Sequence, residues 1–472
     1  MSPSLATLLC AVGILGFFYL DRDKSTHTSK ALWIPVIWFW LNASRPVSMW
    51  LGGAPSTPTV NQQLEGSPTD RLIYMILLAI GLAVLARRGR PAFSLLATNW
   101  PIVLYFSYCL LSVAWSDFPG VALKRWIKAT GDVVMILIIV TDAQPIAALR
   151  RLFSRLGFVL LPVSVLLIKY YPTVGRTYDS WTGGPSNTGV TTNKNMLGVI
   201  TFVLALGTLW QVLRLWRNSG PHNRFRQLVA QCTLLGCAVW LLFNAHSATS
   251  GACFTLGAGL MLATGLRQIR GRPYAVHALV LSILLLASLI ALTGADAVVL
   301  QALGRNPDLT GRASDIWPTV IPMNPNPLVG AGFESFWLGP RLQEMWDKFP
   351  HLYLNEAHNG YIEVYLNLGL IGVGLIALLL IDGYRRSVAA FRADPSSSSL
   401  MLAYILTAPV YSMTEAGFRM LDLSWSFLLL AIIGSSQIPK LVGESAQFDS
   451  TPSESVRRPP AGARTTSIMV NR

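Results

Sequence analysis

A succession of apolar runs, most of them long enough to cross a lipid bilayer, constrains the fold of this 472-residue chain most strongly. A transmembrane helix needs about 20 mainly apolar residues to cross about 30 Å of hydrocarbon. Such runs predict about thirteen spans, near residues 3–20, 31–51, 72–87, 97–115, 128–141, 156–171, 197–213, 228–245, 251–266, 274–293, 360–381, 400–414 and 421–438. Only 13% of the residues are charged, against about 25% in soluble domains. We therefore predict an all-α polytopic integral membrane protein with about 12–13 transmembrane helices.

The net charge of +14 could indicate either nucleic-acid binding or membrane topology. The basic residues are spread over short connections between the apolar runs, among them 87–90, 150–155, 214–226 and 385–392. Basic connections favour the cytoplasmic side of a membrane. We therefore predict no nucleic-acid partner and place these connections inside the cell.

The same assignment divides the chain into three parts. A polytopic membrane domain covers residues 1–438, and a large external loop, 294–359, lies within it. This loop exceeds what a passive connection needs, so we expect a folded lid over the outer face. The Ser-, Pro- and Arg-rich segment 439–472 is predicted to be a disordered cytoplasmic tail.

A histidine, His358, stands where the external loop runs into a long apolar segment. On a helix that begins at this histidine, Tyr365 and Gly369 lie roughly 20° and Gly372 roughly 40° away around the axis. The glycines would let another helix approach closely beneath the imidazole. Glu363 would lie on nearly the opposite face, so an orienting carboxylate should come from Glu356, Glu415 or elsewhere.

Cations on the predicted outer side oppose the charge rule and need another reason. Lys124, Arg125 and Lys128 follow one apolar run, while Arg176 and Lys194 lie in a polar, Gly-rich loop after another. Backbone N–H groups, hydroxyls and cations suit phosphate and sugar hydroxyls. Two explanations remain open from these residues: an anionic ligand, or anchoring of the side chains at the membrane interface.

The remaining candidates lie nearer to His358 in the sequence. Glu356 closes the external loop and Arg312 lies within it, while Glu415 is predicted at the membrane edge. A carboxylate at that depth needs a partner, either Arg419 or an arginine of the external loop. His246, in another external connection, is a second candidate histidine, although a lone histidine at a helix end is usually only hydrogen-bonded. No cluster of carboxylates for a divalent metal is evident in the sequence, so we predict no metal and no cofactor.

The motif His358-Asn359, nine residues, then Gly369-x-x-Gly372 resembles the histidine signature of the O-antigen ligase and Wzy-type O-antigen polymerase superfamily. Further segments resemble family features in the expected order: Trp115-Ser116-Asp117 before Lys124-Arg125, Asn193-Lys194-Asn195-x-Leu197-Gly198, Thr310-Gly311-Arg312 and Thr414-Glu415. The ligase-like core covers about residues 97–438, and the early Trp-Ile-Pro and Ser-Arg-Pro stretches are most similar to the exopolysaccharide-polymerase (exoQ-like) branch. Where many members carry a Ser-Arg-Thr-like turn, this chain has Ser247-Ala248-Thr249, so one family arginine is missing.

The resemblance implies an inverting, metal-independent glycosyltransferase of the helical-membrane (GT-C-type) class with an undecaprenyl-diphosphate-linked glycan donor. By this resemblance His358 is the general base that deprotonates the attacking sugar hydroxyl. The implied substrate-binding residues, for diphosphate or glycan, are Arg312, Arg176, Arg125, Lys128, Lys124, Lys194, Glu356 and Glu415.

The predicted function is polymerisation of lipid-linked repeat units of an exopolysaccharide or O-antigen. The alternatives are a ligase that transfers the glycan to lipid A-core or protein and, from a different class, a lipid-linked glycan transporter. Besides donor and acceptor glycans, membrane lipids and polysaccharide export and chain-length proteins are candidate partners. The expected location is the bacterial inner (plasma) membrane, with multiple spans and the active site on the periplasmic side.

Overall fold

A computed structural model describes residues 1–450 apart from 24–25, 53–58, 179–182, 218–223, 267–271, 273, 279, 283–311 and 351, with side chains described as far as residue 439. Most of the predicted span 274–293, the first part of the predicted external loop including Thr310-Gly311, and most of the predicted tail therefore lie outside the described residues.

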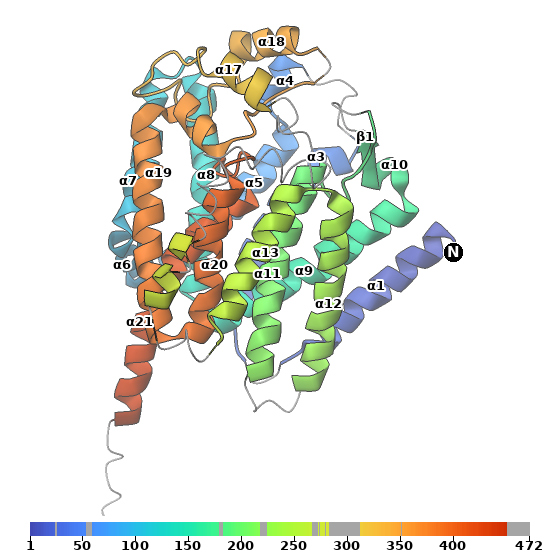
Figure 1. Cartoon of the computed structure of the whole chain (residues 1–472), viewed down its shortest axis with the longest axis vertical. Coiled ribbons are helices and arrows are strands. Elements are labelled where there is room, and N and C mark those ends of the chain that lie inside the picture. Colours follow the sequence, from blue (N-terminus) through green and yellow to red (C-terminus); the bar gives the residue numbers. More distant parts are fainter. Residues whose placement is uncertain are drawn as a thin grey trace, which may run out of the picture.

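The described part of the chain is almost entirely helical (Figure 1). Its α-helices are α1 (Pro3–Leu20), α2 (Trp33–Asn42), α3 (Val47–Trp50), α4 (Val60–Glu65), α5 (Pro68–Arg88), α6 (Arg90–Thr98), α7 (Trp100–Leu111), α8 (Pro119–Val140), α9 (Pro145–Tyr170), α10 (Pro172–Gly175), α11 (Lys194–Arg217), α12 (Arg224–Ala245), α13 (Ala248–Ala263), α17 (Trp317–Val320), α18 (Gly339–Lys348), α19 (Gly360–Ala393), α20 (Pro395–Tyr411) and α21 (Leu423–Ser450). The shorter turns are η1 (Lys30–Leu32), η2 (Ser112–Trp115) and the π-helical η3 (Arg312–Ile316), and β1 (Arg176–Tyr178) pairs antiparallel with β2 (Pro185–Asn187).

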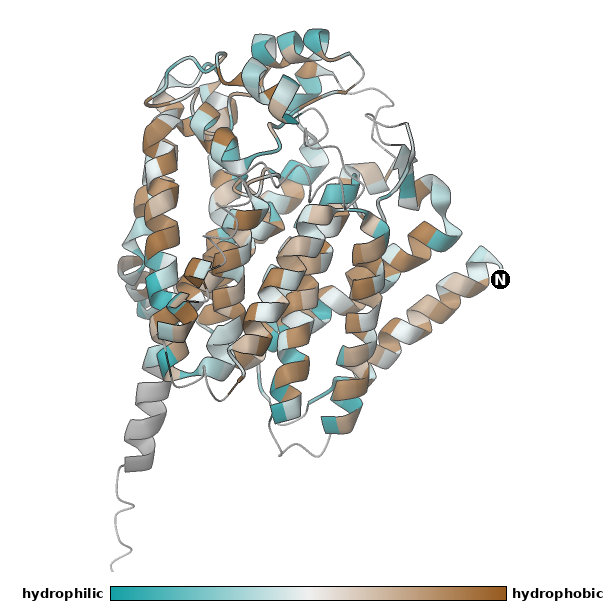
Figure 2. Cartoon of the chain, in the orientation of Figure 1, coloured by the Kyte–Doolittle hydropathy of each residue, from teal (hydrophilic) through white to brown (hydrophobic). Residues whose placement is uncertain are grey.

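The long helices pack around one extended apolar core. Its largest fully buried side chains include Trp38, Phe153, Phe202, Tyr404 and Phe427, which come from helices α2, α9, α11, α20 and α21. Six of the described helices or helix pairs are long and apolar enough to cross a membrane, or seven when the bent pair α6 and α7 is counted as one span. Apolar residues run through the bundle, whereas hydrophilic residues gather on α18 and at the helix ends (Figure 2). The predicted all-α polytopic membrane fold is thus confirmed.

The predicted span 31–51 is broken. The apolar run 31–51 forms α2, which ends at Asn42, and the short α3 after an interruption at Ser44, Arg45 and Pro46. Proline lacks an N–H group and disfavours helical backbone in the residue before it. The freed backbone is used elsewhere, because the Arg45 N–H donates to the Val190 carbonyl at 2.9 Å. The break therefore ties the end of α2 to the loop before α11.

Residues 312–359, called the cap below, fold over one end of the bundle (Figure 1). The cap has an apolar core of its own, built around Phe336, Trp337, Leu342 and Met345, with Leu366 of α19 packed into it. Helix α18 turns its apolar face into this core and leaves charged side chains outside. The described part of the loop is therefore a packed layer, anchored on α19.

Helix α19 is interrupted at Gly369, where the backbone has φ 64°. Cap residues 327–331 fill the interruption: the N–H groups of Leu370 and Ile371 donate to the carbonyls of Pro327 (2.9 Å) and Leu328 (3.2 Å). A Cβ atom on Gly369 would lie 2.2 Å from the Leu328 carbonyl. Glycine is therefore required here both for the left-handed backbone and for space.

Candidate functional site

His358 lies outside the helix that it was expected to begin. Helix α19 starts at Gly360, and the Asn359 side chain caps it by accepting the N–H groups of Tyr361 and Ile362. His358 itself has a left-handed backbone with φ 51°, which is uncommon for a residue with a side chain. The expectation that His358, Tyr365, Gly369 and Gly372 share one helix face was therefore wrong.

The expected role of the two glycines also needs correction. Gly369 admits the backbone of the cap at Leu328 and not another helix. At Gly372 an added Cβ would meet Leu368, one turn earlier on the same helix, at 2.3 Å. The glycines of the histidine motif thus shape the broken helix and its junction with the cap.

Two carboxylates flank the imidazole of His358. Nδ1 lies 2.8 Å from Oε1 of Glu356 and 3.5 Å from Oε2 of Glu415. Both residues are among the expected sources of an orienting carboxylate. The segment before α19 brings Glu356, and the connection between α20 and α21 brings Glu415, so the site forms where the cap meets the bundle.

An arginine pairs with each of these carboxylates. Arg312 Nη1 lies 3.1 Å from Glu415 Oε1 and also donates to the Thr414 carbonyl. Arg419 Nη1 lies 3.4 Å from Glu356 Oε2. The partner of Glu415 is therefore an arginine of the cap, one of the two alternatives expected for it. We call His358, Glu356, Glu415, Arg312 and Arg419 the histidine cluster.

The carboxylates set the protonation of the cluster. Burial alone would lower the pKa of His358, but the negative charge of Glu356 and the contacts with both glutamates outweigh it and raise the pKa to about 9. Burial alone would raise the pKa of Glu356, but the charges of His358, Arg419 and Arg312 lower it to about 2. At neutral pH the resting pair is therefore an imidazolium beside a carboxylate.

A further buried carboxylate, Glu363, fixes the backbone next to His358 without touching the imidazole. It accepts the N–H of Ala357, the residue before His358, and the Trp337 indole N–H at 2.9 Å. Glu363 is 2% exposed. It therefore links the cap core to the segment that carries the histidine.

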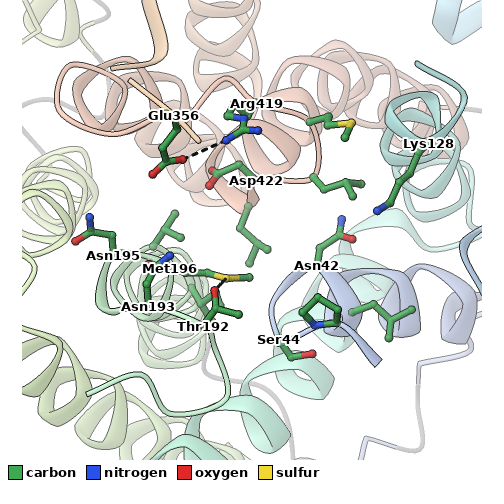
Figure 3. A pocket seen from close by; sticks show the side chains of 18 of the residues that line it. Asn42, Ser44, Lys128, Thr192, Asn193, Asn195, Met196, Glu356, Arg419 and Asp422 are labelled. Atoms are coloured by element: carbon green, nitrogen blue, oxygen red, sulfur yellow. Dashed lines mark hydrogen bonds and ion pairs between the residues drawn. The ribbon is translucent and has the colours of Figure 1, made fainter. Parts of the chain in front are cut away.

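A pocket of about 390 Å³ lies beside the histidine cluster (Figure 3). Glu356, Glu415 and Arg419 form one of its walls, and Asp422 lies next to Arg419. Its volume is within the usual range for small-ligand pockets, about 300–1,000 Å³. Further lining residues come from α2, α3 and the segment between them, from α5 and α8, from the region where α11 starts, and from the adjoining ends of α20 and α21 and the region between them: Leu41, Asn42, Ser44, Pro46, Val47, Asp70, Ile73, Tyr74, Lys128, Thr192, Asn193, Asn195, Met196, Val199, Ile200, Tyr411, Ala416, Met420, Leu421 and Leu423.

The structure brings only some of the predicted cations together. Arg312 joins the histidine cluster, and Lys128 enters the adjacent pocket. Arg125 donates to the carbonyls of Glu334 and Gln63, so it holds the cap and the α4 region against α8. Lys124 lies on α8 and is exposed. Arg176 donates to the Ile168 carbonyl.

The remaining predicted residues flank the site. Lys194 is half-buried at the start of α11, and its neighbour Asn195 donates to Glu415 Oε2 at 3.0 Å. His246 is exposed and has φ 49°. At the turn where the family arginine is missing, the hydroxyls of Thr249 and Thr414 lie 2.6 Å apart, so this turn lies beside the residue whose carbonyl binds Arg312.

Sequence reasoning missed two residues of the site as ligand-facing groups, Arg419 and Asp422. Both lie in the connection 412–422 between α20 and α21, within seven positions of Glu415. A charged triplet in so short a connection between apolar helices was the available signal. Only the fold shows that the cap presents Glu334 and Glu356 to Arg419.

Contrary to the sequence expectation, a set of metal-ligand types does come together. The ligand atoms of Glu356, His358 and Glu415 lie within 4.8 Å of one another. Arg312 and Arg419, however, already supply positive charge to the two carboxylates. A divalent cation would have to compete with both guanidinium groups.

Comparison with known proteins agrees with this architecture. A family model described as O-antigen ligase matches residues 233–377, which include α13, the cap, His358 and the break in α19. The exopolysaccharide production protein ExoQ of Rhizobium meliloti (strain 1021) is 25% identical over 356 residues, which are 72% of this chain and 77% of that protein. These matches confirm the resemblance of the chain to the O-antigen ligase superfamily and its exopolysaccharide-polymerase branch, and they support a membrane function of polymerase or ligase type.

Proposed function

We propose that this protein is a metal-independent inverting glycosyltransferase that polymerises undecaprenyl-diphosphate-linked repeat units of an exopolysaccharide or O-antigen on the periplasmic face of the inner membrane. The observation that carries the proposal is the histidine cluster. In it His358 lies between the carboxylates of Glu356 and Glu415, and each carboxylate pairs with an arginine. A histidine paired with a carboxylate is a suitable proton acceptor, and arginines suit phosphate oxygens. The relative with the printed name exopolysaccharide production protein favours polymerisation.

In the proposed reaction, a hydroxyl of the acceptor sugar gives its proton to His358. Nδ1 faces Glu356, so Nε2 is the nitrogen that remains to take the proton. The hydroxyl oxygen forms a bond to the anomeric carbon of the donor, while the bond from that carbon to the diphosphate oxygen breaks and its electron pair leaves with the phosphate. Arg312, and Arg419 with it, would stabilise the charge that develops on the leaving group.

A ligase that transfers the glycan to lipid A-core or protein is the second candidate function, and the family match favours it. It would share the donor chemistry and differ in the acceptor. A transporter is less well supported, because the charged residues gather where the cap meets the bundle, whereas transporter sites lie near the midplane in broken helices.

The test uses purified full-length protein with its native lipid-linked repeat unit, with and without lipid A-core, and follows product length on gels. We expect a ladder without lipid A-core, and a drop in rate of about 10²- to 10⁴-fold for His358→Ala, the usual contribution of a general base. His277→Ala is the matched control, since His277 is exposed and contacts Tyr384.

Three outcomes would contradict parts of the proposal. Normal elongation by His358→Ala would remove the role of the histidine. A single product that forms only with lipid A-core would favour the ligase. Loss of activity in a metal chelator, restored by one divalent ion, would replace the metal-independent mechanism with a metal bound at Glu356, His358 and Glu415.

A further inference from the structure

The carboxylates of the histidine cluster have two sets of neighbours. His358 and Arg312 contact these carboxylates but are not among the residues that line the pocket. The pocket is lined by Glu356, Glu415 and Arg419. A transfer reaction has two substrates, and this arrangement offers separate surroundings for each.

The pocket differs in chemistry from the histidine cluster. Its lining combines amides, hydroxyls and carboxylates with the cations of Lys128 and Arg419, and Leu41, Ile73, Met196 and Ile200 supply apolar surface. Sugars present hydroxyls that both donate and accept hydrogen bonds, together with apolar C–H faces. The lining therefore matches an uncharged saccharide better than a diphosphate, which would need several unpaired cations.

Two groups in this pocket keep unused hydrogen-bonding capacity. The Lys128 ammonium lies 4.0 Å from the centre of the Tyr74 ring and pairs with no carboxylate among the residues that the structure describes. Asp422 accepts the N–H of Ser424 at 2.7 Å and pairs with no side chain in the described part of the chain. Figure 3 shows Lys128 entering from the side opposite Glu356 and Asn195, with Asp422 between these sides.

The neighbouring polar groups are, by contrast, already committed to the fold. The Asn42 amide donates to Asp132 at 3.2 Å and accepts the Tyr74 hydroxyl at 2.9 Å. Asp132 is fully buried and also accepts the Trp38 indole N–H at 2.7 Å. Asp70 accepts both the N–H and the hydroxyl of Ser48. These contacts hold the walls in place and leave Lys128 and Asp422 as two charged groups available to a ligand.

We propose that this pocket is the subsite for the acceptor saccharide, and that Lys128 and Asp422 bind its hydroxyls and so determine which acceptor is elongated. This inference rests on the proposed glycosyl transfer. It reassigns Lys128 from the diphosphate of the donor to the acceptor, because Lys128 lines the pocket and Arg312 does not.

The experiment measures binding and transfer separately. The probe is the repeat-unit oligosaccharide released from its lipid by mild acid, which lacks the diphosphate, titrated calorimetrically into detergent-solubilised full-length protein. We expect Lys128→Met and Asp422→Asn each to weaken binding of this probe at least 10-fold and to raise its KM as acceptor, with the KM of the lipid-linked donor unchanged. Asparagine can still accept the Ser424 N–H, so the second variant keeps the start of α21.

The controls are Lys348→Met and Asp347→Asn on α18, the same exchanges at exposed positions of the cap. Both should bind the oligosaccharide as the wild type does. His358→Ala should also bind the oligosaccharide normally. An inactive His358→Ala variant that binds normally would support both the catalytic role of His358 and the acceptor subsite. Active His358→Ala would overturn the catalytic role alone. Unchanged oligosaccharide binding by the two pocket variants, no binding by the wild type, or an effect confined to the KM of the lipid-linked donor would each overturn the acceptor subsite.

Discussion

Glu356 and Glu363 lie on either side of His358 in the sequence but belong to two regions with different roles. Glu356 is part of the histidine cluster, and Glu363 is part of the junction between the cap and α19. Glu356 approaches the imidazole and Arg419, so its negative charge controls the protonation of the histidine cluster. Glu363 accepts N–H groups from Ala357 and Trp337, so it controls where the backbone before His358 lies. The first region sets a charge and the second sets a position.

A loss of activity alone would not show which of the two regions a substitution has damaged, but other measurements can distinguish them. A change in the histidine cluster should alter the pH dependence or the affinity for substrate. A change in the junction of the cap with α19, formed by Glu363, Trp337, Gly369 and residues 327–331, should alter stability and rate at an unchanged pH midpoint. The following substitutions test that separation, from the largest expected effect to the smallest.

Gly369→Ala should damage the junction most. The new Cβ would lie 2.2 Å from the backbone of Leu328 at a residue with φ 64°. Backbone strain and overpacking together should cost about 2–4 kcal/mol of unfolding free energy. Thermal unfolding in detergent measures this, and limited proteolysis of the cap shows where the structure loosens.

Gly374→Ala, on the same helix, is the matched control. No atom lies within 4 Å of its added Cβ, and alanine is favoured over glycine in a helix by about 1 kcal/mol. Its stability should therefore be equal or slightly higher. If Gly369→Ala had the same melting temperature as this control, the account in which the cap fills the break in α19 would be wrong.

Arg312→Gln should damage the histidine cluster instead. Glu415 would lose its cation, and the developing charge on the leaving group would lose a stabilising donor, so kcat/KM for the donor should fall about 10²- to 10³-fold. Arg341→Gln, which removes the ion pair between this cap residue and Asp117 in the segment before α8, should leave the kinetics unchanged. Equal kinetics for the two variants would contradict a role of Arg312 at the donor.

Glu363→Gln should have a smaller effect, by removing one buried charged acceptor while keeping the shape of the side chain. A hydrogen bond to a charged group contributes about 1.5–3 kcal/mol, so we expect a lower melting temperature and about a 10-fold lower kcat. The pH midpoint of the rate should stay where it is in the wild type. A shifted midpoint would show that Glu363 acts on the charge of His358 and would remove the distinction drawn above.

Much of the membrane fold could be predicted because hydropathy acts locally along the chain. The apolar runs at Pro3–Leu20, Lys194–Arg217 and Arg224–Ala245 did become long apolar helices. Breaks were harder to predict, since the run 31–51 is apolar enough to be taken as one span although Ser44, Arg45 and Pro46 interrupt the helix there. Gly369 was recognised as part of a motif, but its function as a gap for Leu328 depends on a contact across 41 positions of sequence.

The site was predicted in part for a similar reason. His358, Glu356 and Glu415 are brought together as expected, because the motif and the cost of a carboxylate at the membrane edge both point to the same place. The cations could not be assigned from sequence, because their partners are backbone carbonyls of distant segments. Arg125, for example, binds the carbonyls of Gln63 and Glu334.

The central claim is that His358 takes the proton of the acceptor while Glu356 sets its pKa, and the pH profile of kcat/KM tests it most directly. Burial opposes the raised pKa of His358, about 9, and the charge of Glu356 sustains it. The base form is therefore a minority at pH 7, and the wild-type rate should rise with pH up to about 9. In Glu356→Gln the rising limb should move to lower pH by at least about one pH unit. A profile that falls from pH 7 to 9, or one with the same midpoint in both proteins, would contradict the account.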